Sequence, residues 1–143
     1  MAIRKATKND AAAIRDLLEQ LDYPVANGFV EDKLAAIINH PDQVLLVYTL
    51  ENKVVAFISI HFVPQIAMPG DFAVISYFSV DNDARGKGIG KELEDYCTKL
   101  ALDRKCDRIQ VHCHSRRIEA HKFYERQGYE ESPKYYVKKL QYK

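Results

Sequence analysis

The sequence lacks the features that would assign it to a membrane, secreted or nucleic-acid-binding class. No apolar run approaches the ~20 residues that a membrane-spanning helix needs. Residues 1–5 lack the apolar stretch of a secretory signal. The net charge is only +1 over 143 residues, so neither nucleic acid nor an anionic membrane is indicated as a partner. We expect one cytoplasmic domain that spans residues 1–143, because this length suits a single core and no linker or repeat interrupts it.

Cysteine is also scarce. The three cysteines cannot all pair with one another, and none belongs to a CxxC motif, which favours a reducing compartment over a disulfide framework. A metal site built from Cys106, His112, Cys113 and His114 would have a spacing unlike that of a zinc finger or ribbon. We therefore expect no bound metal.

Positive and negative charges nearly balance over the whole chain, but they are unevenly distributed along it. Residues 1–80 hold 6 basic and 9 acidic side chains, whereas residues 81–143 hold 15 basic and 11 acidic ones. A small polyanionic ligand would favour the second half of the chain. A chance fluctuation of the surface would give the same numbers, so charge alone does not decide between the two.

Apolar periodicity predicts the elements in order. Thr7-Lys8-Asn9-Asp10 has the form of a capping box with Asp in place of Glu, and the helix that it starts ends at Asp22-Tyr23-Pro24. Residues 63–71 lack a clear period and are predicted to form a loop. Strands are expected near 2–6, 44–50, 54–62, 72–80, 109–113 and 135–140, and helices near 11–21, 30–39, from 88 onward, and 118–127. This order predicts a mixed α/β sheet with helices on both faces, in which residues 72–113 form a parallel, right-handed strand–helix–strand unit.

The segment Arg85-Gly86-Lys87-Gly88-Ile89-Gly90 lies between an expected strand and an expected helix. Its glycines permit positive φ and a close approach of backbone N–H groups to a ligand. The helix start adds N–H donors and a positive dipole end, so the segment favours a phosphate or pyrophosphate. Its spacing fits neither a Walker loop nor a GxGxxG dinucleotide fingerprint. A plain strand-to-helix connection would explain the glycines equally well.

Two segments together resemble a known family. Ser79-Val80 followed by residues 85–90 is similar to the coenzyme A pyrophosphate motif of the GCN5-related N-acetyltransferases (GNAT family). Residues 119–129 (EAHKFYERQGY) resemble that family's A-x-x-F/L-Y-E-x-x-G-F/Y segment. The resemblance covers nearly the whole chain. It implies a three-layer αβα fold whose central sheet is mixed and mostly antiparallel, with splayed parallel strands in the middle.

The resemblance also implies an enzyme that transfers an acetyl group from acetyl-CoA directly to an amine, within a ternary complex and without a metal. Val80 would contribute a backbone N–H that polarises the thioester carbonyl. Tyr124 would be the general acid that protonates the departing thiolate. The residues implied to bind the cofactor are Phe78, Ser79, Val80, Arg85, Gly86, Lys87, Gly88, Ile89, Gly90 and Lys91.

The acceptor side is less well defined. His61-Phe62, Ala120–Tyr124 and the Tyr135–Leu140 ending resemble a bacterial subgroup related to aminoalkylphosphonate N-acetyltransferases. Members of that subgroup carry acidic residues on the strand before the pyrophosphate loop. At the positions of those acidic residues this sequence has Ser76 and Tyr77, which are candidate substrate-side residues. The general base could then be a water chain, His114 or His61, so the two histidines are candidate substrate-side residues as well. Arg116 and Arg117 would face an acidic acceptor, the cofactor phosphates or solvent.

Three functions follow from this resemblance. A small primary amine is the expected acceptor, which predicts a closed pocket. A protein or peptide amine would instead need an open groove near residues 63–71. A module that binds acetyl-CoA without turnover is the third, because the carboxylates are missing. Family habit implies a homodimer.

Overall fold

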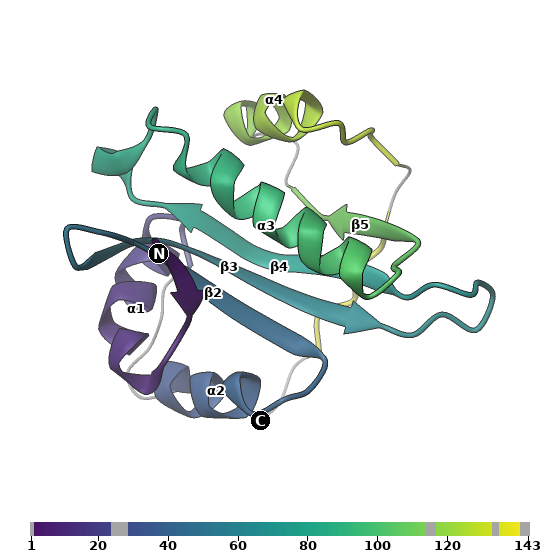
Figure 1. Ribbon diagram of the computed structural model, residues 1–143, viewed down its shortest axis with the longest axis horizontal. Helices are drawn as coiled ribbons and strands as arrows, with labels where there is room; N and C mark the ends of the chain where they lie inside the picture. Colours follow the sequence, from purple (N-terminus) through teal and green to yellow (C-terminus); the bar gives the residue numbers. More distant parts are fainter. Residues whose placement is uncertain (1, 24–28, 114–116, 133–134, 141–143) are drawn as a thin grey trace. The chain divides into compact units, whose positions relative to one another are not determined.

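The computed structural model describes residues 2–23, 29–113, 117–132 and 135–140. Its contacts divide the chain into two compact units, Met1–His112 and Cys113–Lys143. The first unit holds a five-stranded sheet with helices on both faces (Figure 1). The second holds helix α4 (Ile118–Arg126). Within the described ranges, no helix has the length and apolar character needed to cross a bilayer.

The strands of the first unit follow one another across the sheet in the order β1-β2-β3-β4-β5. Strands β1 to β4 pair antiparallel, and β4 pairs parallel with β5, so the predicted mixed and mostly antiparallel sheet is confirmed. The parallel pair ends the described sheet instead of lying in its middle, because residues 135–140 add no strand. The strands are β1 (Ile3–Lys5), β2 (Gln43–Leu50), β3 (Lys53–Val63), β4 (Phe72–Val80) and β5 (Arg108–Val111).

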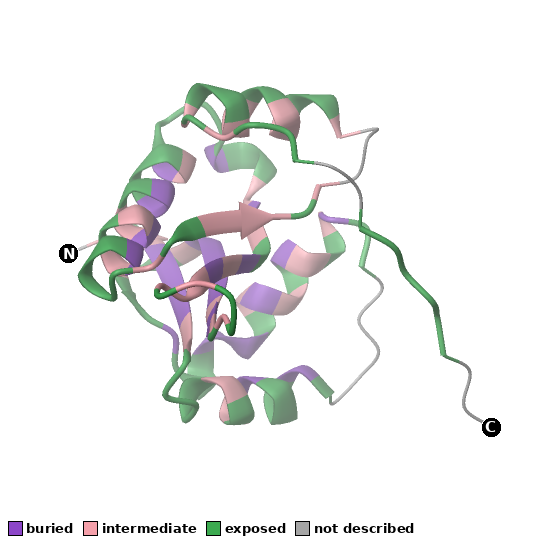
Figure 2. Ribbon diagram, turned by 90° about the vertical axis from the view of Figure 1, so that its right-hand side faces the viewer, coloured by how far each residue is buried: buried purple, intermediate pink, exposed green. Residues whose placement is uncertain are grey.

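Alternating side chains of the sheet form two cores. Leu45 and Val47 of β2 pack with helices α1 (Ala11–Glu19) and α2 (Phe29–Ile38) on one face. Leu46 and Tyr48, which alternate with them, pack with helix α3 (Ile89–Asp103) on the other face. The period of two places successive side chains on opposite faces, so the buried stretches of β2 and β3 carry mostly apolar side chains on both faces. Buried residues accordingly lie in the sheet and along helix sides (Figure 2).

The start of α1 confirms the predicted capping box. A 3₁₀ turn, η1 (Lys8–Asp10), precedes the helix, and the Thr7 backbone N–H donates to Asp10 Oδ2 at 2.7 Å. Asp10 is buried and also accepts from the Arg4 guanidinium at 2.8 and 2.9 Å. The hydrogen bond from Arg4, followed by that from the Thr7 backbone, lowers the pKa of Asp10 against the opposing effect of burial. Asp10 therefore joins β1 to the start of α1.

The strand predicted at residues 135–140 is wrong. These residues form no strand, and the segment is exposed along its length (Figure 2). Tyr136, Val137 and Leu140 are among its exposed side chains. The prediction rested on tyrosine and valine, which favour strands only where a pleated neighbour covers them. Within the described part of the chain, no strand pairs with this segment.

Candidate functional site

The glycine-rich segment connects β4 to α3, as predicted. A short 3₁₀ turn, η2 (Asn82–Ala84), comes first, and Gly86 and Gly88 then take φ values of 82° and 78°. This left-handed conformation disfavours residues that carry a Cβ. A Cβ built on either glycine would meet no atom within 4 Å, so open space faces both residues. The connection therefore has the backbone and the free space that a bound phosphate group needs.

Helix α3 begins directly after the glycine-rich segment, with Gly88 as its N-cap. Its first helical hydrogen bond runs from the Glu92 N–H to the Gly88 carbonyl at 3.1 Å. The N–H groups of residues 89–91 precede that bond, and the positive end of the helix dipole lies with them. A pyrophosphate fits this chemistry, because several N–H donors converge where negative charge is favoured.

The three predicted cations of the segment lie in different settings. Arg85 Nε donates to the Val80 carbonyl at 3.2 Å, which folds this side chain back toward the end of β4. Lys91 forms an exposed ion pair with Asp95 at 2.8 Å. Lys87 is exposed. Exposed pairs are worth little and exchange readily, so Lys91 can turn from Asp95 to an anionic ligand.

A glutamine that sequence reasoning missed fixes the start of this connection. Gln20, which follows α1, donates to Asp81 Oδ2 at 3.3 Å and accepts from the Asn82 N–H at 2.9 Å. Asp81 also accepts from the Asp83 N–H at 2.9 Å and so caps the η2 turn. The hydrogen bonds from Asp83 and Gln20, and then the charges of Lys53 and Arg85, lower the pKa of Asp81. Gln20 is separated from these partners by about 60 positions in sequence, so no local sequence pattern could predict the contact.

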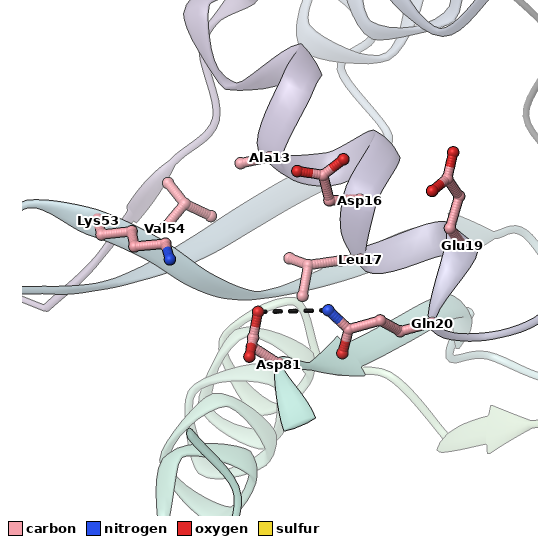
Figure 3. A pocket seen from close by; sticks show the side chains of 8 residues that line it. All are labelled: Ala13, Asp16, Leu17, Glu19, Gln20, Lys53, Val54 and Asp81. Atoms are coloured by element: carbon pink, nitrogen blue, oxygen red, sulfur yellow. Dashed lines mark hydrogen bonds between the residues drawn. The ribbon is translucent and has the colours of Figure 1, made fainter. Parts of the chain in front are cut away.

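A pocket of about 480 Å³ lies beside this contact, lined by α1, the start of β3 and Asp81. In Figure 3 the Gln20 amide reaches Asp81, whereas Glu19 points away from it. The pocket contains none of the predicted cofactor or substrate residues. The Asp81 carboxylate in this pocket already accepts hydrogen bonds from Gln20 and Asp83. We therefore infer that the residues around the pocket hold the connection between β4 and α3 in place.

A second missed contact holds the first turn of α3. The Tyr48 hydroxyl on β2 donates to Glu92 Oε2 at 2.6 Å. This hydrogen bond, together with burial and the negative charge of Glu92, raises the pKa of Tyr48. The contact ties the predicted phosphate-binding end of the helix to the sheet.

Strand β4 extends beyond its parallel neighbour. Its ladder with β5 starts at Phe72 and Arg108 and ends at Ile75 and Val111, while β4 continues to Val80. No β5 residue pairs with Phe78, Ser79 or Val80 along this edge, and the splay predicted there stays a prediction. Ser79 is buried, and its Oγ donates to the Leu17 carbonyl of α1 at 3.1 Å, so only its backbone can serve a ligand along this edge.

Three of the four candidate substrate-side residues lie on β3 and β4, and two of them are in contact. Ser76 Oγ lies 2.8 Å from His61 Nδ1. The adjacent Tyr77 ring meets the Tyr23 ring edge to face, with centroids 5.3 Å apart. Ser76, Tyr77 and Tyr23 are exposed, and His61 is half-buried. The fourth candidate, His114, lies outside the described residues, as does Arg116.

The predicted acid Tyr124 lies on α4, in the second unit. It is half-buried, and its ring contacts those of Phe123 and Tyr129 at centroid distances of 5.4 Å. The helix ends as predicted, because Gly128 takes a φ of 94° and the Tyr129 N–H donates to the Tyr124 carbonyl at 3.0 Å. Arg117 is the N-cap of α4 and is half-buried.

The cysteines carry no sign of reactivity. Burial raises the pKa of Cys97 to about 12 and also raises that of Cys106 and Cys113. All three thiols are free. Across the residues that the structure describes, no group of three or more His, Cys, Asp and Glu side chains is placed to hold a metal ion.

The fold is thus a mixed, mostly antiparallel sheet flanked by helices, with a glycine-rich connection at the start of α3. The chain matches the model of the acetyltransferase (GNAT) family over residues 11–129 and belongs to that family. It is therefore an N-acetyltransferase, and GNAT acetyltransferases use acetyl-CoA. None of the curated proteins compared with the chain matches it.

Solved structures share the fold at low sequence identity. A transcriptional regulator from Bacillus halodurans C-125 has a TM-score of 0.87 at 22% identity, over 96% of this chain and 98% of its own. The ribosomal-protein-alanine N-acetyltransferase from Brucella melitensis biovar Abortus 2308 has 0.79 at 20%, over 96% and 97%. The aminoglycoside acetyltransferase meta-AAC0020 from an uncultured soil metagenomic sample has 0.80 at 20%, over 97% and 95%. These likenesses show the fold, and their different names leave the acceptor open.

Proposed function

We propose that this enzyme transfers the acetyl group of acetyl-CoA to a small primary amine. The observation that carries the proposal is the connection at Gly86 and Gly88, where two left-handed glycines open onto the start of α3. The pyrophosphate would bind the N–H groups of residues 86–90, with Arg85, Lys87 and Lys91 as cationic partners. The pantetheine arm would pair with the backbone of Phe78 to Val80, beyond the end of the β4–β5 ladder.

The chemistry proposed is direct attack of the neutral amine on the thioester carbonyl. A backbone N–H near Val80 would polarise the carbonyl oxygen. Tyr124 would give its phenolic proton to the departing thiolate. A phenol of pKa about 10 next to a thiol of pKa about 8.5 can do so without large tuning. Support for this role is the family match over residues 11–129, which includes Tyr124.

The acceptor would lie against His61, Ser76 and Tyr77, with His114 as a further candidate. The contacts of His61 with Ser76 and of Tyr77 with Tyr23 support this assignment, because His61 lies on β3, and Ser76 and Tyr77 lie on β4 just before Phe78. The resemblance to the aminoalkylphosphonate subgroup adds aminoalkylphosphonates as acceptors to test, with Arg117 as a candidate partner for the phosphonate. We further propose a cytoplasmic location and a homodimer.

Thermal melting with coenzyme A, acetyl-CoA and ATP tests the cofactor half of this proposal. Both coenzyme A species should raise the melting temperature, and ATP should do so less, because it offers no pantetheine to β4. Thiol release should then be followed with a panel of primary amines that includes an aminoalkylphosphonate. Failure of both coenzyme A species to stabilise the protein would refute the cofactor site. Stabilisation without thiol release from any amine would instead indicate a binding module.

A peptide amine is the second candidate acceptor. It would need an open groove near the loop between β3 and β4, where Ile66 is fully exposed at 107% of its reference area. A single exposed apolar side chain is common on protein surfaces, so the amine panel decides between the two acceptors. N-terminal peptides belong in the same panel, and a kcat/KM for them above that of every small amine would favour this candidate.

A further inference from the structure

Ser76 occupies an irregular position in β4. Along the β3–β4 ladder Ser59 pairs with Tyr77, but the next pair is Ile60 with Ile75, so Ser76 is the extra residue of a β-bulge. A bulge interrupts the alternation of side chains and re-aims the residue that it contains. The re-aimed hydroxyl meets His61 Nδ1 at 2.8 Å, across the two strands.

This pair lies close to where the proposed thioester would sit. Ser76 precedes Phe78 by two residues, which is about 7 Å along an extended strand. An amine nitrogen at hydrogen-bond distance from Ser76 Oγ would therefore lie within several ångströms of a carbonyl held at Phe78 to Val80. Tyr77, which follows Ser76, is exposed and contacts the Tyr23 ring, and within the described chain neither His61 nor Ser76 is hydrogen-bonded to a carboxylate.

Without a carboxylate beside Ser76 and His61, another group must accept a proton from the acceptor amine. A primary alkylamine is largely protonated near neutral pH and has no lone pair for attack until it loses a proton. A serine hydroxyl is a poor base by itself, but it can accept a hydrogen bond from an ammonium group and donate one to a neighbour at the same time. An imidazole is the side chain best suited to take a proton near neutral pH.

We propose that Ser76 and His61 form a proton relay that activates the acceptor amine, a role that rests on the proposed function. One N–H bond of the ammonium breaks as its proton passes to Ser76 Oγ, while the Ser76 hydroxyl proton passes to His61 Nδ1. The products are a neutral amine, an intact serine hydroxyl and an imidazolium, so charge and protons balance. His61 then returns its proton to solvent. The relay requires the tautomer in which Nδ1 accepts from Ser76.

The test compares two acceptors that differ in basicity. The first is an alkylamine that the enzyme acetylates, and the second is a hydrazide or arylamine of similar shape that is already neutral at the assay pH. Ser76→Ala and His61→Gln should lower kcat for the alkylamine by about 100-fold or more. Their kcat for the neutral acceptor should fall only a few-fold, and the KM for acetyl-CoA should stay unchanged.

Two control variants separate the relay from a structural role of the bulge. Ser76→Thr keeps the hydroxyl and should restore most of the alkylamine rate. Tyr77→Phe removes a neighbouring hydroxyl but keeps the ring contact with Tyr23, and it should affect both acceptors equally. Thermal melting checks that each variant is folded. Equal losses for the two acceptors in Ser76→Ala, or no loss at all, would overturn the relay alone. A wild-type protein that binds acetyl-CoA but acetylates no amine would overturn the proposed function and the relay together.

Discussion

Gly88 takes a backbone conformation that costs a residue with a Cβ about 1–2 kcal/mol. Gly88→Val should therefore destabilise the fold modestly. It should abolish coenzyme A binding, because its side chain would occupy the space open to the phosphates. Calorimetric titration with coenzyme A measures the loss, and thermal melting checks the fold. Gly128→Ala imposes a similar strain at a φ of 94° in the second unit, outside residues 85–90 of the connection, and should retain affinity. Retained affinity in Gly88→Val would show that the pyrophosphate binds elsewhere.

Tyr124 is proposed to act only on the leaving thiolate. Tyr124→Phe should lower kcat by about 100-fold, within the usual range for the loss of a general acid. The affinity for acetyl-CoA should change little, because the ring and its contacts with Phe123 and Tyr129 are kept. Steady-state kinetics together with a binding titration separate the two quantities. A variant as active as the wild type would remove Tyr124 from the acid role.

Asp10 should make stability depend on pH in the acid range. Its pKa is lowered in the folded state, chiefly by the hydrogen bond from Arg4, so it stabilises the fold above its unfolded pKa of about 4. That contribution is lost as the pH falls through the folded pKa. Asp10→Asn should lower the free energy of unfolding by about 2 kcal/mol at pH 7, and the gap to wild type should narrow below about pH 4. Urea denaturation at both pH values measures it. Asp42→Asn, at an exposed ion pair with Arg104, is the control and should change little.

At the scale of elements, α1 supports the connection between β4 and α3 through one side chain. Gln20→Leu removes both hydrogen bonds at the start of the η2 turn and should raise the KM for acetyl-CoA several-fold, with kcat nearly unchanged, because the turn leads into the glycines proposed to bind the pyrophosphate. Glu19→Leu changes a neighbour that points away from Asp81 and should leave that KM unaltered (Figure 3). A KM for Gln20→Leu that equals the wild-type value would show that the turn holds its shape unaided.

The helices and strands differ in how far the spacing of apolar residues predicts them. The helix at residues 11–19 and the strands at 43–50 and 53–63 follow from local pattern, because burial on one or both faces leaves a direct signature in the sequence. The bulge at Ser76 and the contact of Tyr48 with Glu92 leave no such signature, since they depend on pairing between distant segments. The strand predicted at residues 135–140 is wrong for the opposite reason: a local signal is present without the pairing that it implies. Tyrosine and valine favour a strand in the sequence whether or not a neighbouring strand exists.

The site could be predicted in part. The glycines before a helix predicted a connection with positive φ, and Gly86 and Gly88 have it. That the connection binds a phosphate stays a prediction. The meeting of Ser76 with His61 could not be predicted, because the register between β3 and β4 decides it. The roles of Tyr124 and of the substrate-side residues stay predictions.

For the whole molecule, we predict that residues 1–143 unfold as one domain. A single domain of this size should give one cooperative transition, with coincident midpoints by circular dichroism and by tyrosine fluorescence. Acetyl-CoA should shift both midpoints together. Two separated transitions would show instead that residues 113–143 fold independently of the first unit.

The bulge at Ser76 has a consequence for comparing this protein with its relatives. Before it, Ala73 and Ile75 face the α3 core, and after it Phe78 and Val80 do so, which means that odd and even positions exchange roles within one strand. A relative without the bulge has one residue fewer between its equivalents of Ile75 and Phe78. A sequence alignment that places no gap at Ser76 would then superimpose core residues on surface residues along half of the strand. Comparisons of acceptor residues across such relatives need a one-residue gap at that position.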